Sequence, residues 1–226
     1  MADLLIRNAL VVNETDTFEA DITVNDGIIT GVGAVGTGGK AGREIDGTGL
    51  VVLPGCIDLH VHFNDPGFTY REDFATGTRA AAAGGMTMVV DMPLAGKPTV
   101  TDEEAVLAKK NAVASKAYID YGLWGGLVDN NLGRLSSMLG AEVMGFKAFM
   151  ADAGPEFPFV QSDVLLEGMK KAEELGALVA LHCEDDLLVK HLEKIEQSQG
   201  AGDVSSYLRS RPPYTETLAV NVAVKL

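Results

Sequence analysis

The sequence predicts an α/β protein, in which a parallel sheet covered by helices follows a small β unit. From Leu50 onward, apolar runs of strand length alternate with helical patterns, which is the order of repeated β-α units. These strands are almost continuously apolar, as expected for parallel strands buried on both faces. A composition of 46% hydrophobic and 22% charged residues over 226 positions suits a globular protein. We therefore expect a small β domain over residues 1–50 and a second domain over 51–226.

The N-terminal unit is expected to be a small antiparallel sheet. A strand is predicted over residues 4–12. The apolar runs 22–24 and 28–30 flank Asn25-Asp26-Gly27, a sequence typical of a hairpin turn. The glycines of 36–42 are scattered and do not match a phosphate-binding loop, so they predict a simple connection.

The second domain is expected to contain about five β-α units. Gly84-Gly85 and Gly176 end two of the predicted helices, and Thr101 to Glu104 has the spacing of a capping box at a helix start. The predicted strands cover residues 51–60, 87–91, 118–127, 143–150 and 177–183. The predicted helices cover residues 73–83, 101–116, 132–139, 162–175 and 184–197, and short helical stretches continue to Leu226.

Charge and cysteine content exclude several classes of protein. A net charge of −14 argues against a nucleic-acid partner, which needs clustered Lys and Arg, and against an anionic membrane surface. No apolar run has the length of a membrane span. Cys56 and Cys183 are too few for a disulfide framework, so we expect two buried thiols. These observations favour a soluble, cytoplasmic protein.

Two histidines, His60 and His62, follow the apolar run 50–59. Because side chains alternate along a strand, residues two apart leave the same face. Neutral imidazole is a good ligand for zinc and related divalent ions. His60 and His62 are therefore candidate metal ligands, and the alternative for this triplet alone is a chance His-Val-His in a surface strand.

Lys147 and His182 lie near the ends of two further predicted strands. Lys147 is flanked by aromatic residues, and a buried ammonium tends to lose its proton because burial disfavours the charge. A neutral amine can react with carbon dioxide to form a carbamate, an anion that can bridge two cations. The alternatives are a lysine that extends to water and a core histidine with a satisfied hydrogen bond. Glu184-Asp185-Asp186 is expected to cap the following helix.

The string from Pro54 to His62 resembles the metal-binding opening of the amidohydrolase superfamily. The segments 62–67, 72–74 and 76–87 resemble its cyclic-amide branch, which contains allantoinases, dihydroorotases and hydantoinases. Segments 145–147 and 181–184 resemble those that carry the carboxylated lysine and the next metal histidine. The resemblance spans the chain and implies an incomplete TIM (β/α)8 barrel of the metal-dependent hydrolase type, preceded by part of a small β-sandwich domain.

The same resemblance implies a dinuclear metal centre. His60 and His62 would bind the more buried ion, an N6-carboxylated Lys147 would bridge both ions, and His182 would bind the more exposed one. Zinc is expected, and manganese, cobalt or iron also suit these ligands. The implied activity is hydrolysis of a ring amide in a small cyclic ureide, by a homo-oligomer that is a tetramer in the family.

Two positions bear on which cyclic amide is the substrate. Dihydroorotases usually place an arginine two residues after the second histidine and an asparagine after Met-Pro, and these side chains hold the substrate carboxylate. The matching positions here are Asn64 and Leu94. Both resemble allantoinases, whose substrate is uncharged, so we expect Asn64 and Leu94 to bind allantoin for hydrolysis to allantoate in purine breakdown. Dihydroorotase and hydantoinase (dihydropyrimidinase) are the alternatives.

The sequence departs from the family in its number of barrel strands. The family barrel has eight strands, and we recognise five here. We find no counterpart of the metal histidine on the sixth strand, or of the aspartate on the eighth that binds metal and transfers the proton, so no catalytic residue is assigned. We expect either an allantoinase-like hydrolase in an incomplete chain or a non-catalytic, truncated paralogue that acts as an assembly partner. In both cases the 226 residues alone should hydrolyse very little.

Overall fold

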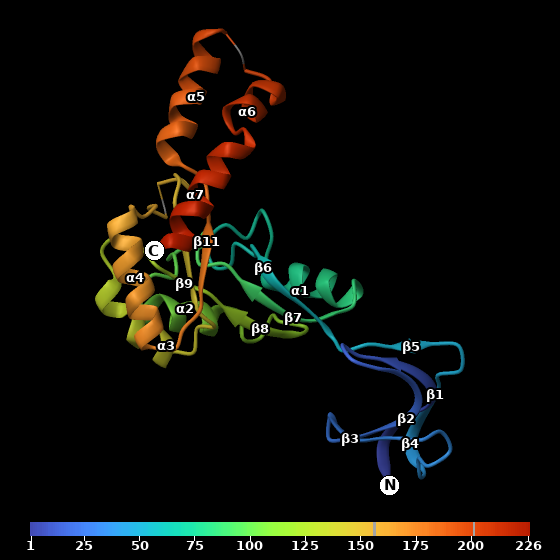
Figure 1. Ribbon diagram of the computed structural model, residues 1–226. Helices are drawn as coiled ribbons and strands as arrows, with labels where there is room; N and C mark the ends of the chain where they lie inside the picture. The colour runs from blue at the N-terminus through green and yellow to red at the C-terminus, as the bar shows by residue number, and fades with distance from the viewer. Residues whose placement is uncertain (156, 201) are drawn as a thin grey trace. The chain divides into compact units, whose positions relative to one another are not determined.

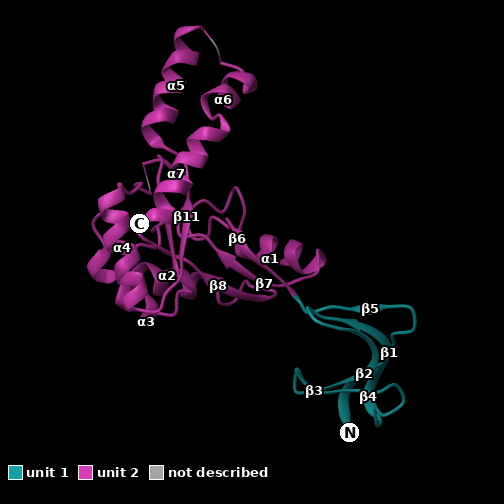
Figure 2. Ribbon diagram, viewed as in Figure 1, with its two compact units in different colours: residues 1–55 teal, residues 56–226 magenta. Residues whose placement is uncertain are grey.

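The computed structural model describes residues 1–155, 157–200 and 202–226. The chain divides into two compact units, Met1–Gly55 and Cys56–Leu226 (Figure 2). Within the described ranges, every helix is too short or too polar to cross a membrane. The two units are considered separately below.

Unit 1, Met1–Gly55, is a five-stranded sheet in which β1 lies between β2 and β4 (Figure 1). Its strands are β1 (Ala2–Val12), β2 (Thr17–Asn25), β3 (Ile28–Gly33), β4 (Ala41–Asp46) and β5 (Val51–Val52). β2 and β3 form the predicted antiparallel hairpin. Asp26 and Gly27 take positive φ angles of 48° and 74° at its turn, which is the conformation that Asn-Asp-Gly sequences favour.

The expectation of an antiparallel unit 1 is wrong for two of its strand pairs. β1 pairs with β4 and with β5 in parallel. β4 follows the β2–β3 hairpin, so the chain must cross back to the free side of β1 before it enters β4, and such a crossover permits parallel pairing. Alternating side chains identify a strand but do not fix its direction.

Unit 2, Cys56–Leu226, contains only parallel strand pairs in the part that the structure describes. Its strands are β6 (Cys56–Val61), β7 (Met86–Asp91), β8 (Asp120–Leu123), β9 (Gly125–Gly126), β10 (Phe146–Phe149) and β11 (Val179–His182). One sheet has the order β6-β7-β8 and the other β11-β10-β9. β8 and β9 are separated only by Trp124, so the strands follow one another in sequence order, as in the expected incomplete (β/α) barrel.

Helices lie between these strands and after the last of them. They are α1 (Phe74–Ala83), α2 (Glu103–Val113), η1 (Leu132–Arg134), α3 (Leu135–Gly140), α4 (Ser162–Glu174), α5 (Asp186–Ser198), α6 (Val204–Ser210) and α7 (Pro213–Lys225). The capping box expected at Thr101 is wrong by one residue, because the Asp102 side chain caps α2 and accepts the N–H of Ala105 at 2.9 Å.

The core of unit 2 lies between its strands and its helices. Phe74, Leu123, Leu127, Phe146 and Leu165 are at most 1% exposed. Full burial of each such side chain contributes about 1.5–3 kcal/mol. This packing holds the strand ends in fixed positions.

The single strand predicted over residues 51–60 is wrong. Pro54 and Gly55 separate β5 from β6, and proline has no N–H to donate to a strand ladder. β5 pairs with β1 in unit 1, whereas β6 pairs with β7 in unit 2. The boundary between the units therefore falls after Gly55, and His60 belongs to β6.

Both cysteines are free. The expectation of a buried thiol is wrong for Cys56, which is exposed at the start of β6, and Cys183 is partly buried after β11. β6 has a partner on one side only among the described residues, so apolar sequence neighbours do not bury its first residue.

Candidate metal centre

His60 and His62 lie at the carboxyl end of β6. The His60 N–H donates to Oδ1 of Asp58 at 2.9 Å, and His62 is the first residue after the strand's last residue, Val61. The two ring centroids are 5.3 Å apart, with an angle of 50° between the ring planes. The i, i+2 spacing therefore brings both imidazoles to one side of the strand.

Lys147 lies in β10 and is only 4% exposed. Its Nζ is 5.0 Å from the centre of the Phe149 ring, and we find no hydrogen bond or ion pair to this amine within the described ranges. Burial lowers the pKa of Lys147, and the nearby Cys183 thiol opposes that shift. The neutral amine that carbamate formation requires is thus favoured at this position.

His182 is the last residue of β11 and lies opposite Phe149 in the pairing of β10 with β11. The His182 ring stacks on Phe149, with 5.1 Å between centroids and 27° between planes. Its Nε2 is 2.8 Å from Oε2 of Glu184. Phe149 therefore contacts two candidate ligands, Lys147 and His182.

A single cavity of about 770 Å³ joins the three strand ends. His60, Lys147 and His182 all line it. The other lining residues include Met92 and Trp124 from the β7 and β8 region, Cys183 and Glu184 after β11, and Tyr207 and Glu216 from α6 and α7. His62 is not part of the cavity wall but lies beside His60, so the structure brings all four predicted metal ligands into one region.

The surrounding protein lowers the pKa of both imidazoles on β6. His60 and His62 are accessible residues, but their rings are partly shielded from water, which disfavours the charged form. Lys147 lowers the pKa of His60 further, and His60 does the same to His62. Both rings therefore remain neutral, and able to bind metal, to a lower pH than an isolated histidine.

A buried ion pair lies beside these histidines. Asp91 ends β7 and Lys109 lies in α2, and they are 1% and 2% exposed. Asp91 Oδ2 contacts Lys109 Nζ, and Oδ1 accepts the N–H of Phe63 at 2.9 Å. Burial raises the pKa of Asp91 even though Lys109 and the Phe63 N–H oppose the shift. The carboxylate thus anchors the backbone directly after His62.

The two predicted substrate-binding residues lie outside the cavity wall. Asn64 is 8% exposed, and its Nδ2 donates to the carbonyl of His62 at 3.1 Å. Leu94 packs against Met92 and Trp124 and lines a second hollow of about 410 Å³. Asn64 is thus linked to the His62 backbone, and Leu94 to two residues of the cavity wall. Their contact with a substrate stays a prediction.

The residues fit a divalent metal in the kind of donor they offer. Three imidazoles and an uncompensated lysine face one region. However, no three His, Cys, Asp or Glu side chains of the described residues gather closely enough to hold an ion. Carboxylation of Lys147 would add an oxygen donor to His60 and His62, which completes the three protein ligands typical of catalytic zinc.

Sequence reasoning missed two residues of this region, Lys109 and Glu184. Lys109 lies four residues after Ala105, on the buried face of α2. A lysine on the apolar face of a predicted helix indicates a buried charge that needs a partner, so the sequence could have identified it. The expectation that Glu184-Asp185-Asp186 caps α5 is confirmed by Asp185, which accepts the N–H of Leu188 at 2.9 Å, but the contact of Glu184 with His182 was not expected. Glu184 lies two residues after His182, and this spacing was the sequence signal that could have predicted their contact.

The sequence is similar to those of known enzymes. The Amidohydrolase family profile matches residues 51–218. The allantoinase of Rubrobacter xylanophilus is 44% identical over 225 residues, which are 99% of this chain and 49% of the relative. The allantoinase of Solibacter usitatus is 40% identical over 227 residues, 100% of this chain and 49% of the relative. The chain spans about half the length of the curated relatives it matches.

Solved structures with the same fold include hydantoinases. The L-hydantoinase (dihydropyrimidinase) from Arthrobacter aurescens has a TM-score of 0.96 at 32% identity and covers 100% of this chain with 50% of its own. A dihydropyrimidinase from Brevibacillus agri has a TM-score of 0.88 at 32% identity, covering 100% of this chain and 49% of its own. The family profile, the sequence relatives and the fold agree: this chain belongs to the amidohydrolase family.

Proposed function

We propose that this chain carries metal-binding residues of an allantoinase-like cyclic amidohydrolase, which converts allantoin to allantoate in purine breakdown. One observation carries the proposal: His60, Lys147 and His182, from three different strands, line the same cavity. The pKa values of His60 and Lys147 are lowered by burial, and such groups in a cavity are candidates for a functional site. The allantoinase relatives support the hydrolase class.

Four residues would hold two divalent ions, and zinc suits them because it binds imidazole nitrogen and oxygen donors. His60 and His62 would hold one ion, His182 the other, and carboxylated Lys147 both. When bound, such ions polarise an amide carbonyl and make hydroxide available near neutral pH. Manganese, cobalt and iron suit the same donors.

The role of Lys147 follows from its burial. Its neutral amine would attack the carbon of carbon dioxide: a nitrogen–carbon bond forms, one carbon–oxygen π bond breaks with its electron pair passing to oxygen, and the amine proton passes to water. The product is a carbamate anion with two donor oxygens. The Phe149 ring lies 5.0 Å from the amine and offers no oxygen or nitrogen acceptor to it. Burial lowers the pKa of Lys147, which increases the share of neutral amine available for this reaction.

The substrate is proposed to be an uncharged ring. Neither Asn64 nor Leu94 supplies a cation that could pair with a substrate carboxylate, as dihydroorotate would need. The sequence relatives named above are allantoinases, while the similar solved structures include hydantoinases, so hydantoin is the main competing substrate.

A chimera tests this proposal. We would join the present chain to the part of the Rubrobacter xylanophilus allantoinase that it does not match, add zinc and bicarbonate, and assay allantoin, dihydroorotate and hydantoin. We expect allantoin to be the best substrate and His60→Asn to reduce its turnover by about 100-fold or more. Preference for dihydroorotate would refute our interpretation of Asn64 and Leu94. A folded, metal-loaded chimera that hydrolyses none of the three compounds would refute the proposed hydrolase function.

A role as a non-catalytic assembly partner is the second candidate. Ile57, Leu59 and Leu178 are 55%, 54% and 63% exposed on or beside the edge strands β6 and β11. Exposed apolar side chains at a strand edge favour pairing with another chain. This candidate predicts concentration-dependent association in sedimentation experiments, unaffected by His60→Asn. A monomer at all concentrations would contradict it.

We also propose a cytoplasmic, homo-oligomeric protein with a small-molecule substrate. The two unpaired cysteines support a reducing compartment. Light scattering of the purified protein would measure the oligomeric state, for which the family resemblance predicts a tetramer.

A further inference from the structure

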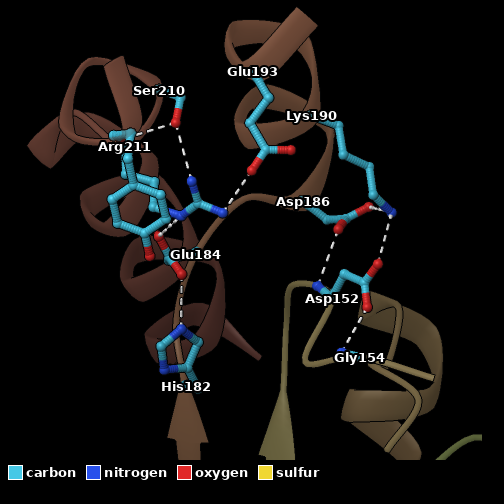
Figure 3. A network of polar contacts seen from close by, with 10 residues as sticks. Asp152, Gly154, His182, Glu184, Asp186, Lys190, Glu193, Ser210 and Arg211 are labelled. Carbon is cyan, nitrogen blue, oxygen red and sulfur yellow. Dashed lines mark hydrogen bonds and ion pairs between the residues drawn. The ribbon is translucent and has the colours of Figure 1, made fainter. Parts of the chain in front are cut away.

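A chain of polar contacts links the end of β11 to the helices that follow it (Figure 3). His182 Nε2 lies 2.8 Å from Oε2 of Glu184, and Oε1 of Glu184 lies 3.8 Å from Nε of Arg211. A carboxylate accepts hydrogen bonds and does not donate them. The proton of the imidazole therefore belongs on Nε2, and Nδ1 keeps its lone pair.

Arg211 is itself held in place by residues of α5 and α6. Its Nη2 donates to Oε1 of Glu193 at 2.6 Å, and its Nη1 donates to Oγ of Ser210 at 3.0 Å. The guanidinium also lies over the Tyr207 ring, 4.1 Å from its centre. These contacts restrict the conformations of Arg211, so its guanidinium stays close to the Glu184 carboxylate.

Two independent contacts orient the His182 ring. Phe149 stacks on its face with 27° between the planes, and Glu184 binds its Nε2 edge. Glu184 does not cap α5, because Asp185 is the N-cap residue. The Glu184 carboxylate is therefore available to accept a hydrogen bond from the imidazole.

We propose that Glu184, held by Arg211, is a positioning residue that fixes the tautomer and the orientation of His182. This inference rests on the proposed metal-binding role of His182. A carboxylate on the second nitrogen of a metal-binding histidine commonly sets the ring orientation, and its loss weakens metal binding by about 10- to 100-fold. Through Arg211, the helices α5 and α6 thereby act on a residue of the candidate centre.

The test begins with the metal-free protein. Nitrogen-15 NMR of the His182 ring reports which nitrogen carries the proton. We expect the proton on Nε2 in the wild type, a mixture of tautomers in Glu184→Ala, and an intermediate result in Glu184→Gln, whose amide oxygen can still accept. Arg211→Met should move the signal toward that of Glu184→Ala.

Arg209 provides a matched control. It lies in α6, two residues before Arg211, and pairs with Glu196 of α5 at 2.7 Å, but that pair does not reach Glu184. Arg209→Met should leave the His182 tautomer unchanged. If Glu184→Ala fails to fold, Glu184→Gln and Arg211→Met make the same comparison. An unchanged tautomer in every folded Glu184 variant would overturn the proposal.

Cobalt titration of the 226-residue chain, followed by visible absorption, completes the test. We expect Glu184→Ala to weaken cobalt binding about 10- to 100-fold relative to the wild type and to Arg209→Met. Equal affinity in all three proteins would overturn the positioning role. Failure of the wild type to bind cobalt would overturn the proposed metal centre instead, while the metal-free spectra still decide whether Glu184 sets the tautomer.

Discussion

Asp21 in unit 1 and Asp91 in unit 2 are both buried carboxylates, 2% and 1% exposed, but they are compensated very differently. Asp21 accepts the N–H groups of Asn8, Gly36 and Gly38 and lies 3.5 Å from Arg7. Hydrogen bonding from the Asn8 N–H, above all, lowers its pKa. Asp91 accepts a single backbone N–H and contacts Lys109, and burial raises its pKa.

The contrast separates a structural carboxylate from one beside a candidate site. Unit 1 satisfies its buried charge with backbone donors, as a stable fold requires. In unit 2 the Asp91 carboxylate and the Lys147 amine have fewer polar partners, and both lie near the histidines of the strand ends. Folds tolerate such groups mainly where they serve function.

The largest effect is expected when the Asp91–Lys109 pair is broken. Lys109→Met leaves a buried carboxylate without its cation and should lower the free energy of unfolding by about 3–5 kcal/mol. The double variant Asp91→Asn with Lys109→Met should lose less than Lys109→Met alone. Urea unfolding measures these values.

The neighbouring lysine is the control for that experiment. Lys110 pairs with exposed Glu142 at 2.7 Å, so Lys110→Met should cost about 1 kcal/mol or less. Equal losses for Lys109→Met and Lys110→Met would show that burial of the Asp91 pair has no energetic importance.

A smaller loss is expected at Gly77 in α1, because a Cβ there would overlap the Phe63 ring. Phe63 follows His62, so Gly77→Ala should displace this segment, reduce stability by about 1–3 kcal/mol and weaken metal binding. Gly133→Ala is the matched control, since its Cβ would meet no atom within 4 Å. Thermal unfolding and cobalt titration measure both effects, and a neutral Gly77→Ala would contradict the close packing behind His62.

The opposite sign is expected at Lys147. Replacing its buried, unpaired amine by methionine should raise the free energy of unfolding by about 1 kcal/mol while abolishing carbamate formation. Lys170→Met is a suitable control, because Lys170 pairs with Glu167 at the exposed surface. A destabilised Lys147→Met protein would mean that the amine has a stabilising partner.

The smallest effects concern pH. The contribution of Asp21 to stability is present above its ordinary pKa of 3.8 and is lost as the pH falls through its lowered pKa. For Asp91 the sign reverses: its raised pKa means that protonation relieves the cost of the buried charge as the pH falls. Hydrogen exchange should therefore show amides of unit 1 losing protection with acid, and Asp21→Asn should flatten that dependence. If the protection of unit 1 amides depended on pH equally in the wild type and in Asp21→Asn, Asp21 would not be the source of the pH dependence.

The sequence predicts most strands and helices of this fold because their signals are local. Gly84 ends α1 and Gly176 follows α4 as expected. The parallel pairing of β4 with β1 and the break at Pro54 depend on partners distant in the chain, so the pattern around each strand cannot reveal them.

The residues of the candidate site also divide into those with a local sequence signal and those defined by a distant partner. The sequence could bring His60, His62, Lys147 and His182 together as candidates because parallel strands place their carboxyl ends together, whereas their metal-binding roles follow from the family resemblance and stay predictions. Lys109 and Arg211 could not be assigned in this way, since each is defined by a side-chain contact with a distant residue, Asp91 or Glu184. Only the folded chain shows those partners.

The central claim is that the strand ends hold a metal centre bridged by carboxylated Lys147. Native mass spectrometry of the chain prepared with zinc and carbon-13 bicarbonate tests it directly. The account predicts bound zinc together with one labelled carbon dioxide adduct, and loss of the adduct in Lys147→Met. A wild-type protein that carries neither zinc nor the adduct, while remaining folded, would contradict it.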